Sequence, residues 1–211
     1  MRGDEMVIRE CGCSEIRANI RRIRNSGLAD TLEEYTFDRF RTDQPWQKVI
    51  KELAQRFVTD HYGKWLYAGG QSGSGKSHLC TAVAGELLKQ GKSVRYMLWR
   101  DESVKLKACV NDDYEYSRLI EPLKCVEVLY IDDLFKTMQN RAVTQADVNL
   151  AFELLNYRYI NKRLVTILSG EKSVEELIQT DEAVGSRIYH RTKEYCIEIS
   201  RDRTRNYRLK N

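Results

Sequence analysis

Residues 65–77 read Trp65-Leu66-Tyr67-Ala68-Gly69-Gly70-Gln71-Ser72-Gly73-Ser74-Gly75-Lys76-Ser77, an apolar run followed at once by a loop rich in glycine and serine. The loop fits the pattern G-x-x-x-x-G-K-[ST], which is meaningful only where a strand precedes it and a helix follows it. Here the apolar run 65–68 predicts a buried strand, and a helix is predicted from Ser77 to about Gln90. This strand–loop–helix order predicts an α/β fold whose loop binds nucleotide phosphates.

The residues of this loop have separate physical roles at such a site. Glycine lets backbone N–H groups turn inward around phosphate oxygens, and the following helix presents the positive end of its dipole. Lys76 supplies a point charge for the β- and γ-phosphates, and the hydroxyl of Ser77 is a ligand for Mg²⁺. We therefore expect ATP and Mg²⁺ to be bound by Gly70, Gln71, Ser72, Gly73, Ser74, Gly75, Lys76 and Ser77.

A second motif lies at residues 126–133, which read Val126-Glu127-Val128-Leu129-Tyr130-Ile131-Asp132-Asp133. Ligands gather at the carboxyl ends of strands in open α/β sheets, so both aspartates are expected beside the phosphate loop. Asp132 is predicted to hold magnesium, and Asp133 to polarise the attacking water. Acidic residues are common in turns after strands, so the pair predicts a site only in combination with the phosphate loop.

Predicted strands and helices alternate along the rest of the chain. The strands are predicted at 65–68, 94–98, 126–131, 164–168 and 195–199. The helices are predicted near 46–61, 76–90, 102–110, 144–162, 173–179 and 181–192. Such alternation is typical of a parallel sheet covered by helices on both faces, here with five strands.

The first 44 residues are predicted to form a basic helix and a connector, and residues 45–211 the ATPase domain. Isoleucines recur at helical spacing in 14–26, and Arg17, Arg21 and Arg24 line another face of the same helix. One interpretation of these arginines is a solvated face, and the other is contact with DNA or an acidic partner. The net charge of +4 permits nucleic-acid contact without requiring it.

The composition argues against membrane and secreted classes. No apolar run approaches the roughly 18 residues of a membrane span, and the N-terminal residues MRGDEM are polar, unlike a signal peptide. Four of the six cysteines are scattered singly, as is typical of a reduced protein. We expect a cytoplasmic protein with no membrane partner.

Several spaced motifs resemble the DnaC-type helicase loaders, a group that includes the IstB transposition ATPases and phage replication proteins. The matching segments cover roughly residues 30–200 and lie at 35–40 (Tyr-Thr-Phe-Asp-Arg-Phe), 70–79, 131–134, 155–159 and 185–188. The resemblance implies an AAA+ P-loop NTPase fold, ATP-dependent homo-oligomers and loading of a replicative helicase onto single-stranded DNA. It adds His78 to the nucleotide-binding residues. Independently of the resemblance, residues 28–44 are predicted to form a connector whose aromatic residues, at 35–40, pack against the following domain.

In that picture Arg187 is an arginine finger, which reaches the γ-phosphate bound by a neighbouring subunit. Such an arginine stabilises the charge that develops on the transferred phosphoryl group. Without the resemblance, Arg187 would be interpreted as an ordinary charge on a helix surface.

The chain departs from the family pattern in three places. Ser169-Gly170-Glu171 stands where the family has a polar sensor, usually asparagine, and a carboxylate at Glu171 cannot donate a hydrogen bond. The few residues after Ile199 predict no C-terminal lid domain, although Arg203, Arg205 and Arg208 could reach the nucleotide or DNA. Cys11 and Cys13 resemble half of a zinc ribbon, but the other ligands of a four-ligand site are missing, so no zinc site is expected.

Two alternatives to a helicase loader stay open: an IstB-like transposition ATPase, and an ATP-dependent switch that hydrolyses little, which Glu171 favours. For DNA, the resemblance directs the segment after the acidic pair toward a central channel. There Phe135 could stack a base while Lys136 and Arg141 contact the backbone. A core position for Phe135 is equally compatible with the sequence. The nucleotide site is not expected to need Lys136 or Arg141.

Overall fold

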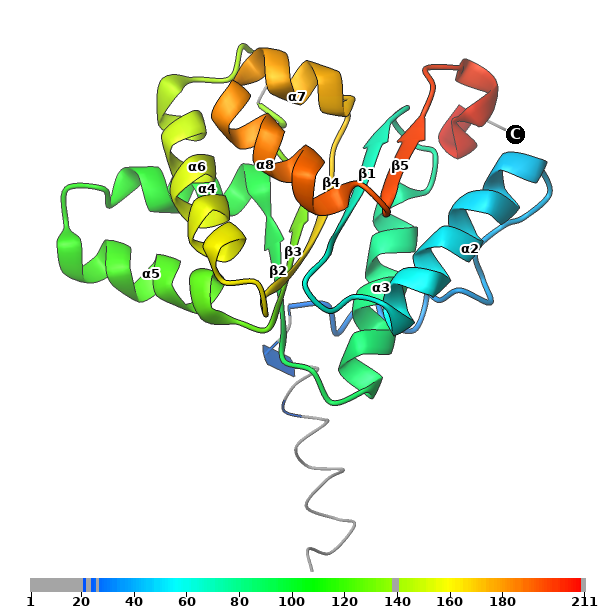
Figure 1. Ribbon diagram of the computed structural model, residues 1–211, viewed down its shortest axis with the longest axis horizontal. Coiled ribbons are helices and arrows are strands. Elements are labelled where there is room, and N and C mark those ends of the chain that lie inside the picture. The colour runs from blue at the N-terminus through cyan, green and yellow to red at the C-terminus, as the bar shows by residue number, and fades with distance from the viewer. Residues whose placement is uncertain (1–20, 22–23, 26, 138–140, 210–211) are drawn as a thin grey trace, which may run out of the picture.

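The computed structural model describes residues 21, 24–25, 27–137 and 141–209, so the predictions for Arg17, Cys11 and Cys13 lie outside the described residues. Its strands form one parallel sheet in the order β2-β3-β4-β1-β5 (Figure 1). They are β1 (Trp65–Gly70), β2 (Val94–Leu98), β3 (Val128–Asp132), β4 (Val165–Ser169) and β5 (Cys196–Ile199). The predicted five-stranded parallel sheet is confirmed, and each boundary differs from its prediction by two residues at most.

Helices cover both faces of the sheet (Figure 1). One face packs against α2 (Pro45–Thr59) and α3 (Lys76–Lys89). The other face packs against α4 (Trp99–Ala108), α5 (Asp113–Cys125), α6 (Gln145–Ile160), α7 (Val174–Thr180) and α8 (Glu182–Thr192). Among the helices that the structure describes, none combines the length and the apolar character needed to cross a membrane.

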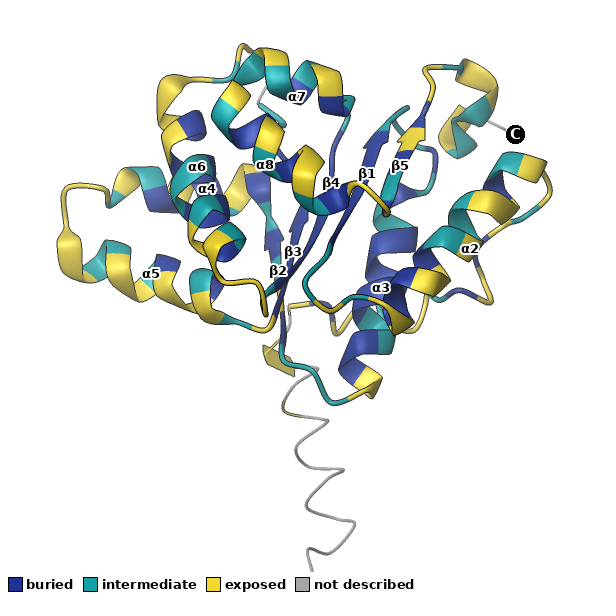
Figure 2. Cartoon of the chain, in the orientation of Figure 1, coloured by how far each residue is buried: buried dark blue, intermediate teal, exposed yellow. Residues whose placement is uncertain are grey.

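The two faces of the sheet contribute to two separate hydrophobic clusters. Along β1, Trp65 and Tyr67 point into the cluster under α6 and α8, and Leu66 and Ala68 point into the cluster under α3. This alternation follows from the two-residue period of a strand. Because both faces are covered, the central strands can be apolar without interruption, and Figure 2 shows β1, β3 and β4 buried almost throughout.

Helix α5 is absent from the predicted elements. Ile120 and Leu123 are buried, and Tyr116 and Leu119 pack against the same cluster, so its apolar residues do recur at helical spacing. Pro122 lies inside the helix, where proline normally argues against one. The helix begins at a cap, since the Asp112 carboxylate accepts a hydrogen bond from the Glu115 N–H at 3.0 Å.

The connector before α2 is part of the core on the α3 side. Phe37 and Phe40 are buried there together with Leu28. The ring of Tyr35 stacks on the imidazole of His78 with centroids 4.9 Å apart. The prediction that the connector's aromatic residues pack against the ATPase domain is confirmed.

Arg158 is fully buried and connects the end of α5, the start of β3 and β4. Its guanidinium donates to the carbonyls of Leu123, Lys124, Val126, Glu127 and Val165, and to the hydroxyl of Thr166. Burial lowers the pKa of Arg158 to about 9, so the group stays charged at neutral pH. This arginine, part of the motif at 155–159, therefore ties the end of α5 to β3 and β4.

Candidate nucleotide-binding site

The phosphate loop joins β1 to α3 at the carboxyl ends of the strands. A cleft opens over it, and its lining comes from the loop, from the segment after β3, from the segment after β4 and from the C-terminal residues. The lining residues are Tyr35, Ser72, Gly73, Gly75, Lys76, Ser77, His78, Asp133, Lys136, Glu171, Tyr207 and Arg208. The cleft therefore contains most of the residues that the sequence predicts for nucleotide binding.

The loop conformation requires glycine at its key positions. Gly70, Gly73 and Gly75 have φ values of 99°, 70° and 92°, which place them in the left-handed region. Space is also lacking, because a Cβ on Gly70 would lie 2.0 Å from the carbonyl oxygen of Ile199. The backbone can thus curl tightly enough for its N–H groups to surround an anion.

Lys76 lies over the loop with its side chain largely buried. Its Nζ donates to the carbonyl oxygens of Gly70 at 3.0 Å and Gln71 at 2.7 Å. Burial lowers the pKa of Lys76, while the carboxylates of Glu171 and Asp133 act in the opposite direction. A cation that is largely removed from water binds an incoming phosphate strongly, because solvent screens it little.

Three hydroxyl groups converge on the carboxylate of Asp132 at the end of β3. The Oγ of Ser77 donates to Oδ1 at 2.9 Å, and the hydroxyl of Tyr96 donates to Oδ2 at 3.2 Å. The Oγ of Ser169 also donates to Oδ1. The predicted meeting of the acidic strand end with the phosphate loop is confirmed. Adjacent hydroxyl and carboxylate oxygens are the ligands that Mg²⁺ prefers, so Ser77 and Asp132 fit a magnesium site.

Asp133 and Glu171 are bridged by one lysine. The Nζ of Lys136 lies 3.1 Å from Asp133 Oδ2 and 3.0 Å from Glu171 Oε1. Burial acts to raise the pKa of Glu171, but the hydrogen bond and charge of Lys136 outweigh it, so this pKa is lowered. Ser169 completes the arrangement, because its Oγ accepts the N–H of Asp133 at 3.1 Å while it donates to Asp132. The residue in contact with both aspartates is thus Ser169, two positions before Glu171.

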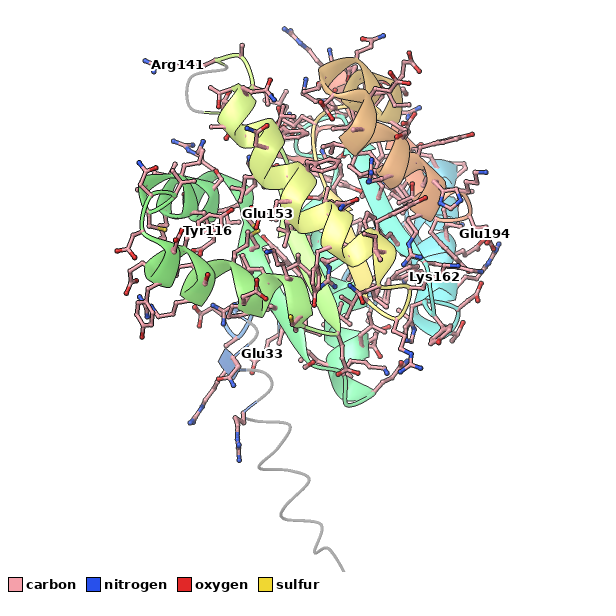
Figure 3. All side chains as sticks on the ribbon, turned by 60° about the vertical axis from the view of Figure 1, so that its left-hand side comes forward. Glu33, Tyr116, Arg141, Glu153, Lys162 and Glu194 are labelled. Carbon is pink, nitrogen blue, oxygen red and sulfur yellow. The ribbon has the colours of Figure 1, made fainter. Side chains whose placement is uncertain are left out.

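The DNA-contact prediction needs two corrections. Phe135 is 4% exposed and packs edge-on against Trp99, with centroids 5.5 Å apart, so its ring is part of the core and cannot stack a base in this conformation. Lys136 lines the nucleotide cleft, although the nucleotide site is not expected from the sequence to need it. Arg141 is exposed, and Figure 3 shows its side chain pointing away from the molecule near the start of α6.

The C-terminal segment packs against the phosphate loop, which the sequence does not reveal. It forms two short 3-10 helices, η2 (Arg203–Arg205) and η3 (Tyr207–Leu209), drawn in red beside α2 in Figure 1. The N–H of Tyr207 donates to the Gly73 carbonyl at 2.9 Å, and the Asp202 N–H donates to Gln71 Oε1 at 2.9 Å.

The side chains of this segment add further contacts. The Tyr207 hydroxyl accepts a hydrogen bond from Gln47 of α2, and Asn206 lies directly against Gly73. Of the three arginines predicted to reach the nucleotide or DNA, Arg208 lines the cleft. Arg205 lies over the ring of Trp46, 5.4 Å from its centroid, and Arg203 is exposed.

Arg187 does not line the cleft of its own chain. It lies on α8, where its Nε donates to Asn156 Oδ1 at 3.0 Å and one terminal nitrogen donates to the Ala183 carbonyl at 2.7 Å. The guanidinium also lies 4.8 Å from the ring centroid of Phe152. His78, by contrast, lines the cleft, and its Nε2 lies 2.8 Å from the carbonyl oxygen of Thr36.

Comparison with known proteins gives consistent matches over nearly the whole chain. The family model of the IstB-like ATP binding proteins matches residues 4–211. The uncharacterized protein YqaM of Bacillus subtilis (strain 168) is 33% identical over 215 residues, which cover 95% of this chain and 66% of YqaM. The phage-like element PBSX protein XkdC of the same strain is 31% identical over 199 residues, which cover 90% of this chain and 73% of XkdC. The chain thus spans about two thirds to three quarters of these relatives.

Solved structures share the fold at lower sequence identity. The DnaC helicase loader aligns with a TM-score of 0.62 at 19% identity, and the match covers 81% of this chain and 98% of that one. The replication initiator DnaA bound to AMPPCP and single-stranded DNA aligns with a TM-score of 0.65 at 20% identity, covering 80% of this chain and 50% of that one. The five-stranded sheet with its flanking helices is therefore the AAA+ fold of these proteins.

Proposed function

The chain belongs to the family of IstB-like ATP binding proteins, and on this premise we propose that it hydrolyses ATP to load a replicative helicase onto single-stranded DNA. The observation that carries the ATPase part is the hydrogen bond between Ser77 and Asp132, with Lys76 folded over the same loop. This arrangement combines a phosphate cradle, a cation and a pair of oxygen ligands for Mg²⁺ at one edge of the sheet.

The proposed roles of the residues follow from their positions. Lys76 binds the β- and γ-phosphates, and the backbone of the loop and the side chain of His78 complete the nucleotide site. Ser77 and Asp132 would hold Mg²⁺, which when bound neutralises charge on the phosphates. Asp133 would orient and polarise the attacking water, because its carboxylate lines the cleft beside the phosphate loop.

The role in replication is supported by likeness to proteins of that process. A solved DnaC helicase loader aligns over nearly its full length, and a DnaA structure with the same fold holds single-stranded DNA. The position of Arg187, away from the cleft of its own chain, supports action on a neighbouring subunit in an ATP-dependent homo-oligomer. The proposed partners are therefore a replicative helicase, single-stranded DNA and further copies of this chain.

Two measurements test the proposal. Titration of the purified chain with a fluorescent ATP analogue should show tight binding that Lys76→Ala abolishes, because the phosphates lose a direct cationic partner. A pull-down with the replicative helicase of the same cell, with and without ATP, should show an ATP-dependent complex. Unchanged nucleotide affinity in Lys76→Ala would refute the assignment of the cradle. Capture of a transposase in place of the helicase would favour the IstB-like transposition role.

A second candidate function is an ATP-dependent switch that hydrolyses little. The ion pair between Lys136 and Asp133 favours it, because this carboxylate is engaged with a cation where the mechanism needs it to contact water. A multiple-turnover phosphate-release assay, with and without single-stranded DNA, separates the two functions. Sustained turnover supports the ATPase, and ATP binding without turnover under both conditions supports the switch.

A further inference from the structure

We propose that Lys136 is a second phosphate-binding cation of the ATP site. Asp133 and Glu171 hold its ammonium group before ATP binds, and the ammonium group then pairs with the terminal phosphate of ATP. The inference rests on the proposed function and assigns a residue that the phosphate-loop and acidic-pair motifs leave out. The first observation is that Lys136 and Lys76 line the same cleft, although Lys76 belongs to the phosphate loop and Lys136 follows the acidic pair.

The backbone after β3 directs Lys136 toward the cleft. Asp133 and Phe135, with φ values of 57° and 61°, are the non-glycine residues with positive φ in the part of the chain that the structure describes. This conformation is unfavourable for a side chain other than glycine and persists only where surrounding contacts enforce it. A strained turn beside the cleft indicates that the path of the backbone at this point serves a function.

Three contacts enforce this turn. The ring of Phe135 is buried against Trp99, and the Leu134 N–H donates to the Ser169 carbonyl at 2.8 Å. The Lys136 N–H donates back to the Asp133 carbonyl at 2.9 Å and closes the turn. The buried phenylalanine therefore anchors the segment, and the residue after it is turned back over Asp133.

The charges of the cleft explain why a cation is needed at this point. Asp133 and Glu171 both line the cleft, and each would repel the terminal phosphate of ATP if no cation stood between them and it. Burial acts to lower the pKa of Lys136, but its hydrogen bonds with Glu171 and Asp133 outweigh burial and raise this pKa, so the ammonium is charged at neutral pH. A terminal phosphate competes with these carboxylates for the same ammonium.

The change of Lys136 from Asp133 to the phosphate also gives Glu171 a role that needs no hydrogen-bond donor. A lysine ammonium has three donors, so Lys136 can keep Glu171 as a partner while it turns from Asp133 to the phosphate. Asp133 is then released to accept a hydrogen bond from water. Glu171 thus acts on the nucleotide through the lysine and does not need to donate a hydrogen bond itself.

The test compares affinities for ADP and for a non-hydrolysable ATP analogue in the full chain with Mg²⁺. Only the ATP analogue carries a γ-phosphate for Lys136, so Lys136→Ala should weaken its binding about tenfold and leave ADP binding within about twofold. Lys136→Arg should restore most of the difference. Lys105→Ala is the matched control, since this lysine pairs with Glu102 on an exposed helix surface away from the cleft.

Glu171→Gln is the second variant and does not depend on loss of the lysine. It removes one of the two carboxylates that compete with the γ-phosphate for Lys136, so affinity for the ATP analogue should rise relative to that for ADP, whereas a purely structural ion pair would lower both affinities together. Equal losses for ADP and the ATP analogue in Lys136→Ala would overturn the proposal, as would reduced DNA binding with unchanged nucleotide affinity. If wild type binds neither nucleotide, the proposed function fails; if wild type binds both and only the Lys136 contrast is absent, this inference alone fails.

Discussion

The Oγ of Ser77 and the Oδ1 of Asp132 lie 2.9 Å apart, although 55 positions separate the two residues in the sequence. Ser77 lies in the first turn of α3, which follows β1, and Asp132 is the last residue of β3, with β4 between the two strands in the sheet. Parallel pairing aligns the carboxyl ends of all three strands at one edge, and this brings the hydroxyl and the carboxylate together. The proposed chemistry of the cleft follows from that convergence.

Replacing Asp133 by asparagine should slow turnover without loss of ATP binding. An amide cannot accept a proton from an activated water, so we expect the turnover rate to fall about 100-fold and ATP affinity to change by about threefold or less. Phosphate release and a binding titration on the same preparation measure the two quantities. Turnover at the wild-type rate would mean that Asp133 is not the polarising acid.

Arg187→Ala should leave the ATP affinity of a single chain nearly intact and lower the turnover of the assembled form by about 1000-fold, the scale of an arginine finger. The substitution also removes hydrogen bonds to Asn156 and Ala183, so thermal unfolding must be followed alongside. Asn156→Ala is the control, because it removes the intramolecular partner and keeps the arginine.

Mixing tests whether Arg187 acts on a neighbouring subunit. Arg187→Ala chains mixed with Lys76→Ala chains should regain some activity, since some interfaces then join an intact cradle to an intact arginine. Absence of activity at every mixing ratio argues against action between subunits.

Arg158→Met should destabilise the fold strongly. The guanidinium donates to five backbone carbonyls in the interior, and methionine leaves these acceptors without their partner. We expect the free energy of unfolding to fall by about 3–5 kcal/mol, as is typical when a buried, hydrogen-bonded charge is removed. Thr166→Val removes only one of the contacts and should cost about 1 kcal/mol. Urea unfolding compares the two, and equal effects would contradict a central role for Arg158.

Tyr207→Ala should weaken nucleotide binding although the residue lies far from the motif in sequence. Its ring packs against Gly75, so the variant should lose affinity about fivefold, corresponding to the ~1 kcal/mol of an aromatic contact. Tyr207→Phe keeps the ring and loses the hydroxyl contact with Gln47, and it should lose less. Leu209→Ala, at an exposed position of the same segment, is the control. If Tyr207→Ala binds ATP like wild type, the segment does not support the loop.

Local sequence patterns were sufficient to predict the strands, most of the helices and the phosphate loop. Each of these depends on a periodic or contiguous signal, such as the apolar run before Gly70 or the one that ends at Asp132. The same patterns missed α5, although its apolar residues recur at helical spacing, because Pro122 lies inside it and argues against a helix. In the structure Pro122 occupies an exposed position, and the helix continues through it.

The sequence by itself determined the chemistry of the cradle, since glycine, lysine and serine at fixed spacing leave little choice of ligand. Only the tertiary structure decided which distant side chains join it. Phe135 and Lys136 are neighbours in the chain, yet one is buried against Trp99 and the other reaches Glu171 in the cleft. The C-terminal Tyr207 reaches Gly73 in the same way. These contacts arise from the order of the strands and from a turn with positive φ at two residues, and no local pattern of residue types encodes either one.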